Sequence, residues 1–168
     1  GNAYLSAFPH ANGKVVVIGD ADDTYDFSQI PELVRPIIEG RAEMVIGSRL
    51  KGTILPGSMP WLHRYIGNPL LTRLLNFTFH SNFSDTHSGL RAISRESLQK
   101  LNLHTGGMEF ASEMLIEAAK KGIVFEEIPI TYYPRKGPSK LHSFADGWRH
   151  IRFIMLVRPL RFLIVPGI

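Results

Sequence analysis

The sequence predicts an α/β fold with parallel strands, and three neighbouring segments carry that prediction. Residues 14–18 (KVVVI) form a short β-branched run that ends at a Gly-Asp pair, which is typical of a strand buried on both faces. Apolar residues then recur at helical spacing over 33–38, and a second apolar run follows at 43–47 (EMVIG). Strand, helix and strand in this order build α/β sheets through right-handed crossovers.

Local chemistry predicts where the first helix begins and ends. Asp26 or Ser28 can cap its start, and Pro31 suits a first turn, where a backbone amide hydrogen is not needed. Gly40 is expected to end the helix, because glycine adopts the left-handed conformation without strain.

The remaining elements follow from the same periodicities and breakers. Helices are expected over residues 61–80, 95–101, 109–121 and 143–157, with Gly122 stopping the third of them. β-rich runs predict strands over 89–94 and 123–133. Glycine, proline and polar residues predict loops over 49–60, 81–88 and 134–141.

Composition limits the classes of function. The chain has 168 residues, an ordinary apolar fraction and no cysteine, so one domain is expected, without disulfides, thiolate metal sites or a cysteine nucleophile. Its formal net charge of +4 suits phosphates or an anionic membrane face as partners. Basic residues are not interleaved with aromatic ones, and no helix-turn-helix pattern occurs, so nucleic acid is not an expected partner.

An acidic cluster follows the first predicted strand. Asp20 and Asp22 lie just past its carboxyl end, which is the edge where open α/β sheets bind ligands. Residues at i and i+2 of an extended segment point the same way, so both carboxylates can serve one Mg²⁺ or Mn²⁺ ion. The alternative is a solvated turn in which Asp26 caps the helix.

Four motifs resemble one enzyme family. They are residues 14–26 (KVVVIGDADDTYD), 44–49 (MVIGSR), 85–91 (DTHSGLR) and 135–141 (RKGPSKL). In this order and spacing they resemble family 2 glycosyltransferases, and within that family the branch that acts on polyprenol or dolichol phosphate. The resemblance runs along essentially the whole chain.

The resemblance implies a fold, a reaction and a place in the cell. It implies a GT-A fold, which is Rossmann-like, here partial and lacking the first βα unit or units that bind the nucleoside. Residues 1–7 resemble the helix after that unit, and both ends of the chain are expected to be cut, so the chain alone is expected to be inactive. The implied enzyme is a hexosyltransferase that moves a sugar from a GDP-mannose or UDP-glucose type donor to a polyprenyl or dolichyl phosphate. It would act at the cytoplasmic face of the cell or endoplasmic reticulum membrane.

The resemblance also implies roles for individual residues. Asp20 and Asp22 would hold the divalent cation on the donor diphosphate, and Asp22, Arg49 and Arg135 would act in catalysis. The donor phosphates would be bound by Arg49, Arg135 and Lys140. The residues expected on the acceptor side are Arg64, Asn68, Asp85, Ser88 and Arg91.

Glu109, Glu113 and Glu117 recur on one face of a predicted helix. They are expected either to form a solvated acidic stripe or to include a carboxylate that faces the acceptor or orients an arginine, with Glu113 the best placed. The seven histidines show no H-E-x-x-H pattern, so surface or capping roles are expected rather than zinc binding. His87 lies inside the acceptor-like motif.

Chemistry leaves three functions open. A phosphate acceptor is largely ionised at neutral pH and needs cationic side chains rather than a base, which suits a site rich in arginine. A hydroxyl acceptor would need a carboxylate base, for which Glu113 or Asp85 is available. The third possibility is a membrane-associated binding module without catalysis.

The carboxyl-terminal residues 143–168 are expected to form an amphipathic helix and the start of a membrane-associated tail, after a catalytic domain over 1–142. Trp148, Met155, Phe144 and Ile151 fall on one helix face, with arginines beside it. Such a helix suits either a membrane interface or ordinary core packing. The basic residues and apolar tail that follow favour an anionic membrane face.

Overall fold

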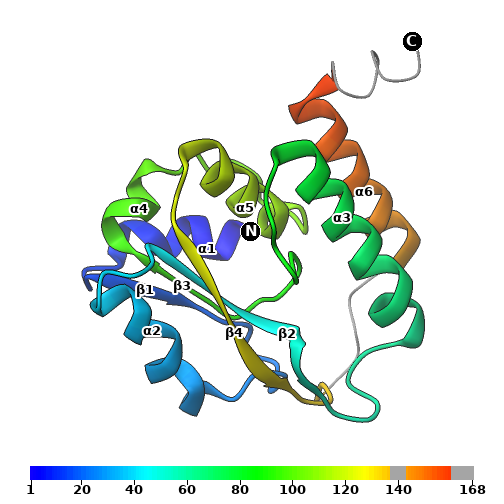
Figure 1. Cartoon of the computed structure of the whole chain (residues 1–168), viewed down its shortest axis with the longest axis horizontal. Coiled ribbons are helices and arrows are strands. Elements are labelled where there is room, and N and C mark those ends of the chain that lie inside the picture. The colour runs from blue at the N-terminus through cyan, green and yellow to red at the C-terminus, as the bar shows by residue number, and fades with distance from the viewer. Residues whose placement is uncertain (137–142, 160–168) are drawn as a thin grey trace.

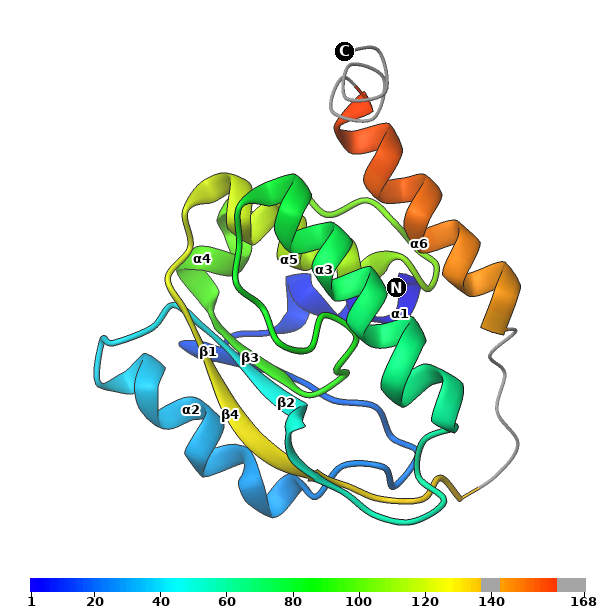
Figure 2. The same cartoon turned by 45° about the vertical axis from the view of Figure 1, so that its right-hand side comes forward.

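The computed structural model describes residues 1–136 and 143–159. A four-stranded sheet forms the middle of the molecule, with helix α2 on one face and the helices α1, α3, α4 and α5 on the other (Figures 1 and 2). This layered α/β architecture confirms the predicted class.

The sheet is mixed. Its order is β1-β3-β2-β4, made by the strands Val15–Ile18, Arg91–Ser94, Met44–Ile54 and Phe125–Tyr132. Strand β3 is antiparallel to both β1 and β2, whereas β2 and β4 are parallel. Strands β1, β2 and β4 therefore run in one direction, and their carboxyl ends meet at one edge. The prediction of full burial for β1 was wrong, because β1 lies at the edge of the sheet and only Ile18 is fully buried.

Strand β2 is longer than predicted. It continues to Ile54 through residues expected to be a loop, with a shift in its register against β4 between Ser48 and Thr53. Gly52 makes this pairing possible, since a Cβ atom there would lie 2.0 Å from the carbonyl oxygen of Ile130. The sequence around residues 49–54 does not predict this extension, because it depends on pairing with the distant strand β4.

Within the described residues, the structure confirms the predicted helices and their order. They are α1 Asn2–Ala7, α2 Ile30–Ile38, α3 Asn68–Phe79, α4 Arg95–Lys100, α5 Phe110–Lys121 and α6 Ser143–Val157, with a π-helical turn, η3, at His63–Gly67 before α3. Asp26 accepts a hydrogen bond of 2.9 Å from the Ser28 amide at the short 3₁₀ turn Phe27–Gln29 that leads into α2. Gly40 and Gly122 have positive φ at the ends of α2 and α5, as predicted.

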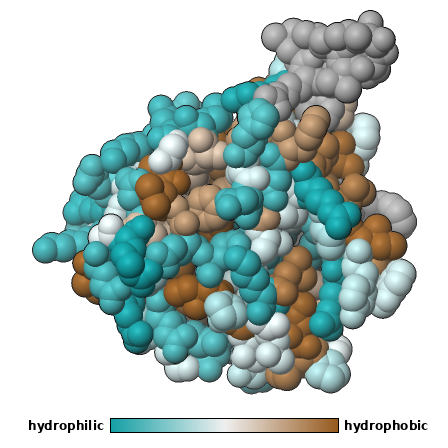
Figure 3. Space-filling model, viewed as in Figure 1, coloured by the Kyte–Doolittle hydropathy of each residue, from teal (hydrophilic) through white to brown (hydrophobic). Residues whose placement is uncertain are grey.

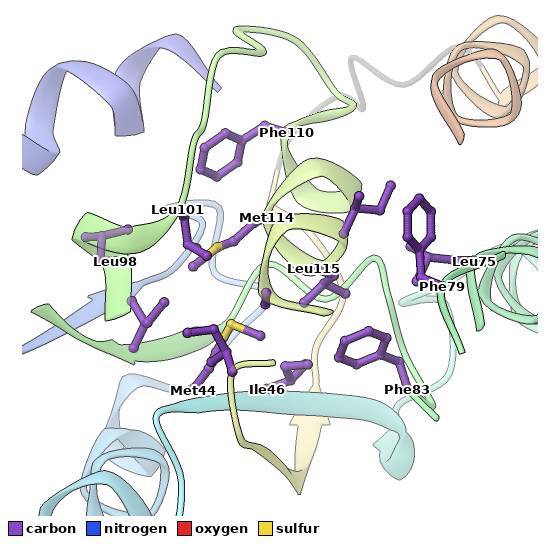
Figure 4. Close-up of a cluster of buried hydrophobic side chains, with 14 of the residues drawn as sticks. Met44, Ile46, Leu75, Phe79, Phe83, Leu98, Leu101, Phe110, Met114 and Leu115 are labelled. Carbon is purple, nitrogen blue, oxygen red and sulfur yellow. The ribbon is translucent and has the colours of Figure 1, made fainter. Parts of the chain in front are cut away.

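Two apolar cores lie on the two faces of the sheet. On the larger side, Met44 and Ile46 of β2 face Met114 and Leu115 of α5, with Phe83 beside them (Figure 4). On the other side, Leu33 of α2 packs against Val45, Leu90 and Ile130. The larger core also includes Ile154 of α6, so the inner side of that helix belongs to the folded unit.

Within the described part of the chain, no helix combines the length and the apolar character needed to span a bilayer.

Candidate active site

The candidate site lies at the edge where β1, β2 and β4 end, and three loops meet there. Tyr25 joins them: its hydroxyl oxygen accepts a hydrogen bond of 2.7 Å from the Gly89 amide, and its backbone forms a bridge with Tyr132. Asp20 lies so close to Gly89 that a Cβ atom at residue 89 would be 2.3 Å from its Oδ2. The fold thus brings the motifs at 20–26, 85–91 and 132–135 together, although they are far apart in sequence.

The two predicted metal ligands lie in this corner, and each already has partners. The Tyr4 hydroxyl donates a 2.8 Å hydrogen bond to Asp20 Oδ1. Asp22 Oδ1 accepts from the amide and hydroxyl of Thr24, while Asp22 Oδ2 lies 2.7 Å from Arg135 Nη2. The side chains of Asp22 and Arg135 are 22% and 31% exposed, so this ion pair faces solvent.

The residues present suit a hard divalent cation. Both side chains offer carboxylate oxygens, which Mg²⁺ and Mn²⁺ prefer, and the Arg135 guanidinium shows that Asp22 Oδ2 accepts a positive group from the solvent side. Among the residues that the structure describes, no three His, Asp or Glu side chains gather at one point. A cation held by Asp20 and Asp22 would therefore depend on substrate phosphate oxygens and water for its other ligands.

Arg49 forms a buried ion pair with Asp85. Its Nε and Nη2 atoms each lie 2.8 Å from a different oxygen of Asp85, and its backbone amide donates to the same carboxylate. Burial would raise the pKa of Asp85, but the charge and hydrogen bonds of Arg49 hold that pKa below its ordinary value. The guanidinium also lies 5.1 Å from the centre of the Tyr132 ring. Both residues belong to the site region, yet their charged groups satisfy each other.

Arg91 and Ser88 shape the loop that carries Asp85. The Arg91 guanidinium donates hydrogen bonds of 2.8–3.0 Å to the backbone carbonyls of Ser88, Ala111 and Thr86. Burial lowers the pKa of Arg91 to about 10. Ser88 is also buried and donates to the carbonyl of Gly47 in β2. In the structure these two side chains are used to hold the 84–91 loop against the sheet.

Glu113 has a contact that neither interpretation of the acidic stripe anticipated. Its carboxylate accepts hydrogen bonds of 2.9–3.0 Å from the backbone amides of His104 and Thr105. Glu113 is buried, as is Glu117, which pairs with Lys120. The stripe is therefore not solvated at these two positions, and Glu113 anchors the 104–105 loop.

The remaining predicted residues lie elsewhere. Arg64 is in the turn η3, with its guanidinium 5.3 Å from the centre of the Tyr65 ring, and Asn68 begins α3 and donates to the sulfur of Met59. This segment follows the loop that leaves β2 (Figure 2). Lys140 lies outside the described residues, as does the expected tail after residue 159. The assigned roles of all these side chains stay predictions.

Several residues of the site region were missed from the sequence. Tyr4 comes from α1 and reaches Asp20 across the sheet edge, for which no local pattern exists. Glu127 of β4 accepts from the Ser84 amide at 2.7 Å and pairs with Lys51 at 2.7 Å. Thr24 and Tyr25 lie inside the first motif, so the resemblance could have indicated them.

Comparison with known proteins identifies the family. A family model described as glycosyl transferase family 2 matches residues 1–101. The chain belongs to glycosyltransferase family 2. As a family 2 chain it is 49% identical over 167 residues to a low-salt glycan biosynthesis hexosyltransferase, Agl6, of Haloferax volcanii, covering 99% of this chain and 40% of that protein. It is also 37% identical over 148 residues to a dolichyl-phosphate hexose transferase of the same organism, covering 88% of this chain and 62% of the relative.

Solved structures confirm the fold. Glucosyl-3-phosphoglycerate synthase of Mycobacterium tuberculosis, crystallised with Mn²⁺, UDP and glucosyl-3-phosphoglycerate, has a TM-score of 0.69 at 20% identity, covering 91% of this chain and 52% of that one. The same enzyme has also been crystallised with Mg²⁺ and UDP. This family 2 chain therefore has a partial GT-A fold, and it spans between 40% and 62% of the lengths of the two curated relatives above.

Proposed function

We propose that this protein transfers a hexose from a nucleoside diphosphate sugar to a lipid phosphate, with Mg²⁺ or Mn²⁺ at Asp20 and Asp22. The observation that carries the proposal is the acidic corner itself: two carboxylates at the carboxyl end of β1, with Arg135 at 2.7 Å from Asp22. The family and its dolichyl-phosphate hexose transferase member support the same reaction.

Asp20 and Asp22 would hold the cation against the donor diphosphate, and the bound cation would stabilise the charge of the leaving diphosphate. The Tyr4 hydroxyl, which donates to Asp20 Oδ1, orients that carboxylate. Arg135 lies beside the same corner with its side chain partly exposed, so its guanidinium is placed to bind a phosphate oxygen. The Arg49–Asp85 pair fixes the neighbouring loop and keeps its backbone in place.

The carboxylates of Asp85 and Glu113 already accept hydrogen bonds within the protein, which favours a phosphate acceptor over a hydroxyl acceptor. A hydroxyl acceptor needs a base, and the two candidates are Asp85 and Glu113. Asp85 is held by Arg49 at both oxygens, and Glu113 is held by backbone amides and the Thr105 hydroxyl. A lipid phosphate is already largely ionised at neutral pH and needs no base. Arg64 and Asn68 are proposed to bind it.

We place the reaction at the cytoplasmic face of a cell or endoplasmic reticulum membrane, where a lipid phosphate meets a soluble nucleotide sugar. Helix α6 supports this placement, because Trp148 is exposed on it and Arg149 and Arg152 are exposed beside it. The division into a catalytic domain over 1–142 and a membrane-associated part over 143–168 is part of the same proposal.

Turnover with two acceptor classes tests the function. The purified protein is given Mn²⁺ and GDP-mannose or UDP-glucose, with either a polyprenyl phosphate or an oligosaccharide, and release of nucleoside diphosphate is measured. Release that requires the lipid phosphate is expected. Release only with sugar hydroxyls would point to the second enzyme class. If calorimetry detects no Mn²⁺-dependent binding of nucleoside diphosphate, both enzyme hypotheses fail and the non-catalytic binding module is favoured.

A further inference from the structure

Helix α3 and the turn before it carry apolar side chains on two opposite faces. The inner face buries Leu71, Leu75 and Phe79 in the core. On the outer face, large apolar side chains are partly exposed: Leu62 is 41% exposed, Ile66 46%, Leu70 57% and Phe77 63%. These four recur at intervals of four, four and seven residues, which places them in one stripe along the helix. A helix that is apolar on both sides has a second surface to bury.

Aromatic and basic residues border this stripe. Trp61 and Tyr65 are 66% and 57% exposed, and their rings are 5.8 Å apart. Arg64 lies against the Tyr65 ring, and Arg73 is exposed within the stripe. Tryptophan, tyrosine and arginine beside aliphatic side chains is the composition that proteins place at the boundary between lipid headgroups and acyl chains.

Helix α6 lies beside α3 in both ribbon views (Figures 1 and 2). It adds exposed Trp148, Met155 and Leu156. Hydrophobic side chains gather on the space-filling surface over the side where these helices lie (Figure 3). We call the stripe on residues 61–77 and these three residues of α6 the α3–α6 face.

The charged residues of the two segments that carry this face, 61–77 and 147–159, have a single sign. No Asp or Glu occurs between residues 44 and 84 or between 147 and 159, and Asp146 is the one acidic residue in the sequence of α6. The basic residues of the two segments are Arg64, Arg73, Arg149, Arg152 and Arg158. An anionic bilayer attracts such a surface, with about 1 kcal/mol per basic residue near the headgroups. A protein partner would have to be both apolar and acidic to match it, so the observations favour lipid.

We infer that the α3–α6 face lies in the headgroup region of an anionic bilayer, with the outer side of α3 inserted alongside α6. The inference rests on the proposed function and adds to it. Arg64 and Asn68 belong to the same segment as the stripe, so docking of α3 brings the residues proposed for the acceptor phosphate to the level of the lipid headgroups.

Vesicle binding of stripe variants tests the inference. The protein is mixed with phosphatidylcholine vesicles, with or without phosphatidylglycerol, and sedimented. We expect Ile66→Asp combined with Leu70→Asp to lower partitioning onto anionic vesicles by about tenfold or more, because buried apolar area drives insertion. The matched control is Ile38→Asp, at a residue 75% exposed on α2 across the sheet, which is expected to bind like the parent. Equal binding of the stripe variant and the control would overturn the inference.

Tryptophan fluorescence tests whether α3 itself enters the bilayer. The chain has two tryptophans, so Trp148→Phe leaves Trp61 as the single probe. Brominated lipids in anionic vesicles are expected to quench it, and an unquenched Trp61 in bound protein would contradict insertion of α3. Self-association that the stripe variant abolishes, without quenching, would assign the face to a second copy of the chain instead.

The test separates this inference from the proposed function. Mn²⁺ and nucleoside diphosphate binding in solution is expected to be unchanged in the stripe variant, since Ile66 and Leu70 are outside the site. If vesicle binding depends on the stripe but no lipid phosphate is glycosylated, the membrane face stands and the function fails. If lipid phosphate is glycosylated and Trp61 stays unquenched, the proposed function stands and the membrane face fails.

Discussion

The charged side chains of the candidate site fall into two groups according to their exposure. Asp22 and Arg135 form a pair that faces solvent, so either partner can exchange for a substrate phosphate or a cation. Arg49 and Asp85 form a pair with side chains 8% and 0% exposed, in which loss of one partner leaves the other buried and charged. Substitutions in the first group should affect binding, and those in the second should affect stability.

Asp22→Asn should weaken Mn²⁺-dependent binding of nucleoside diphosphate by roughly a hundredfold or more, because a ligand charge opposite the diphosphate is lost. Its melting temperature should stay close to that of the parent, since the side chain is partly exposed. Calorimetry measures the binding, and Asp23→Asn, next in sequence and paired with Lys136, is the matched control. Near-normal binding in Asp22→Asn would refute the metal assignment.

Arg49→Met should lower the free energy of unfolding by about 3–5 kcal/mol, because Asp85 would remain buried without its partner. Arg135→Met should change it by no more than about 1 kcal/mol, since that pair is exposed to solvent. Urea denaturation compares the two variants. A large loss of stability in Arg135→Met would show that the loop after β4 has a structural role.

The pH dependence of stability should report His87. Burial lowers the pKa of His87 to about 3 from 6.5, and its ring lies edge-on to His150 at 4.6 Å. Between these pH values the unfolded chain binds a proton that the folded chain does not, so stability should fall as the pH drops below about 6.5. His87→Gln should flatten this part of the curve. The depressed pKa of Asp85 adds a separate loss of stability at lower pH, where protonation of its carboxylate breaks the ion pair with Arg49. If the free energy of unfolding changes with pH equally in the parent and in His87→Gln between pH 6.5 and about 4, His87 is not buried in its neutral form.

At the scale of single elements, the irregular pairing of β2 with β4 positions the site. The register shift between Ser48 and Thr53 includes Arg49, and Gly52 fits against the Ile130 backbone. Beyond the shift, the two strands pair again at Thr53–Thr131 and Ile54–Tyr132, which brings the end of β4 and its loop to the acidic corner.

Gly52→Ala should therefore destabilise the protein by about 1–3 kcal/mol, because a Cβ atom would overlap the Ile130 carbonyl and force the strands apart. Gly147→Ala is the control within helix α6, where nothing lies within 4 Å of an added Cβ atom. That change should be neutral or stabilise by up to about 1 kcal/mol. Equal effects of the two substitutions on the unfolding midpoint would show that β2 tolerates separation from β4.

At the scale of the whole molecule, the sheet separates two surfaces with different chemistry. Its carboxyl edge collects the acidic corner and Arg135, while α3 and α6 on one side collect exposed apolar and basic residues. The net charge of +4 and the single sign of charge on the α3–α6 face predict how salt should act on membrane binding.

Binding to anionic vesicles should weaken as salt rises but should not vanish. The Debye length falls from about 10 Å at 0.1 M to about 3 Å at 1 M, which removes the attraction of the arginines. Insertion of the apolar stripe does not depend on that attraction. Sedimentation with vesicles across this range measures both contributions, and complete release at high salt would mean that the apolar stripe does not insert.

The sequence by itself determined the features that depend on neighbouring residues. Periodicity predicted the helices, Gly40 and Gly122 predicted two helix ends, and four ordered motifs indicated the family that comparison then confirmed. The position of Asp20 and Asp22 at the end of a strand was also predictable, because strand and turn signals are local. Their roles in binding the cation remain predictions.

Tertiary structure alone decided the contacts that join distant segments. It inserted β3 between β1 and β2, extended β2 along β4, and paired Arg49 with Asp85 across 36 residues. It turned Glu113 toward backbone amides and kept large apolar side chains exposed on the outer face of α3. These contacts depend on which surfaces meet when the layers pack. A local sequence pattern cannot predict them, because the partner residues are distant in the sequence.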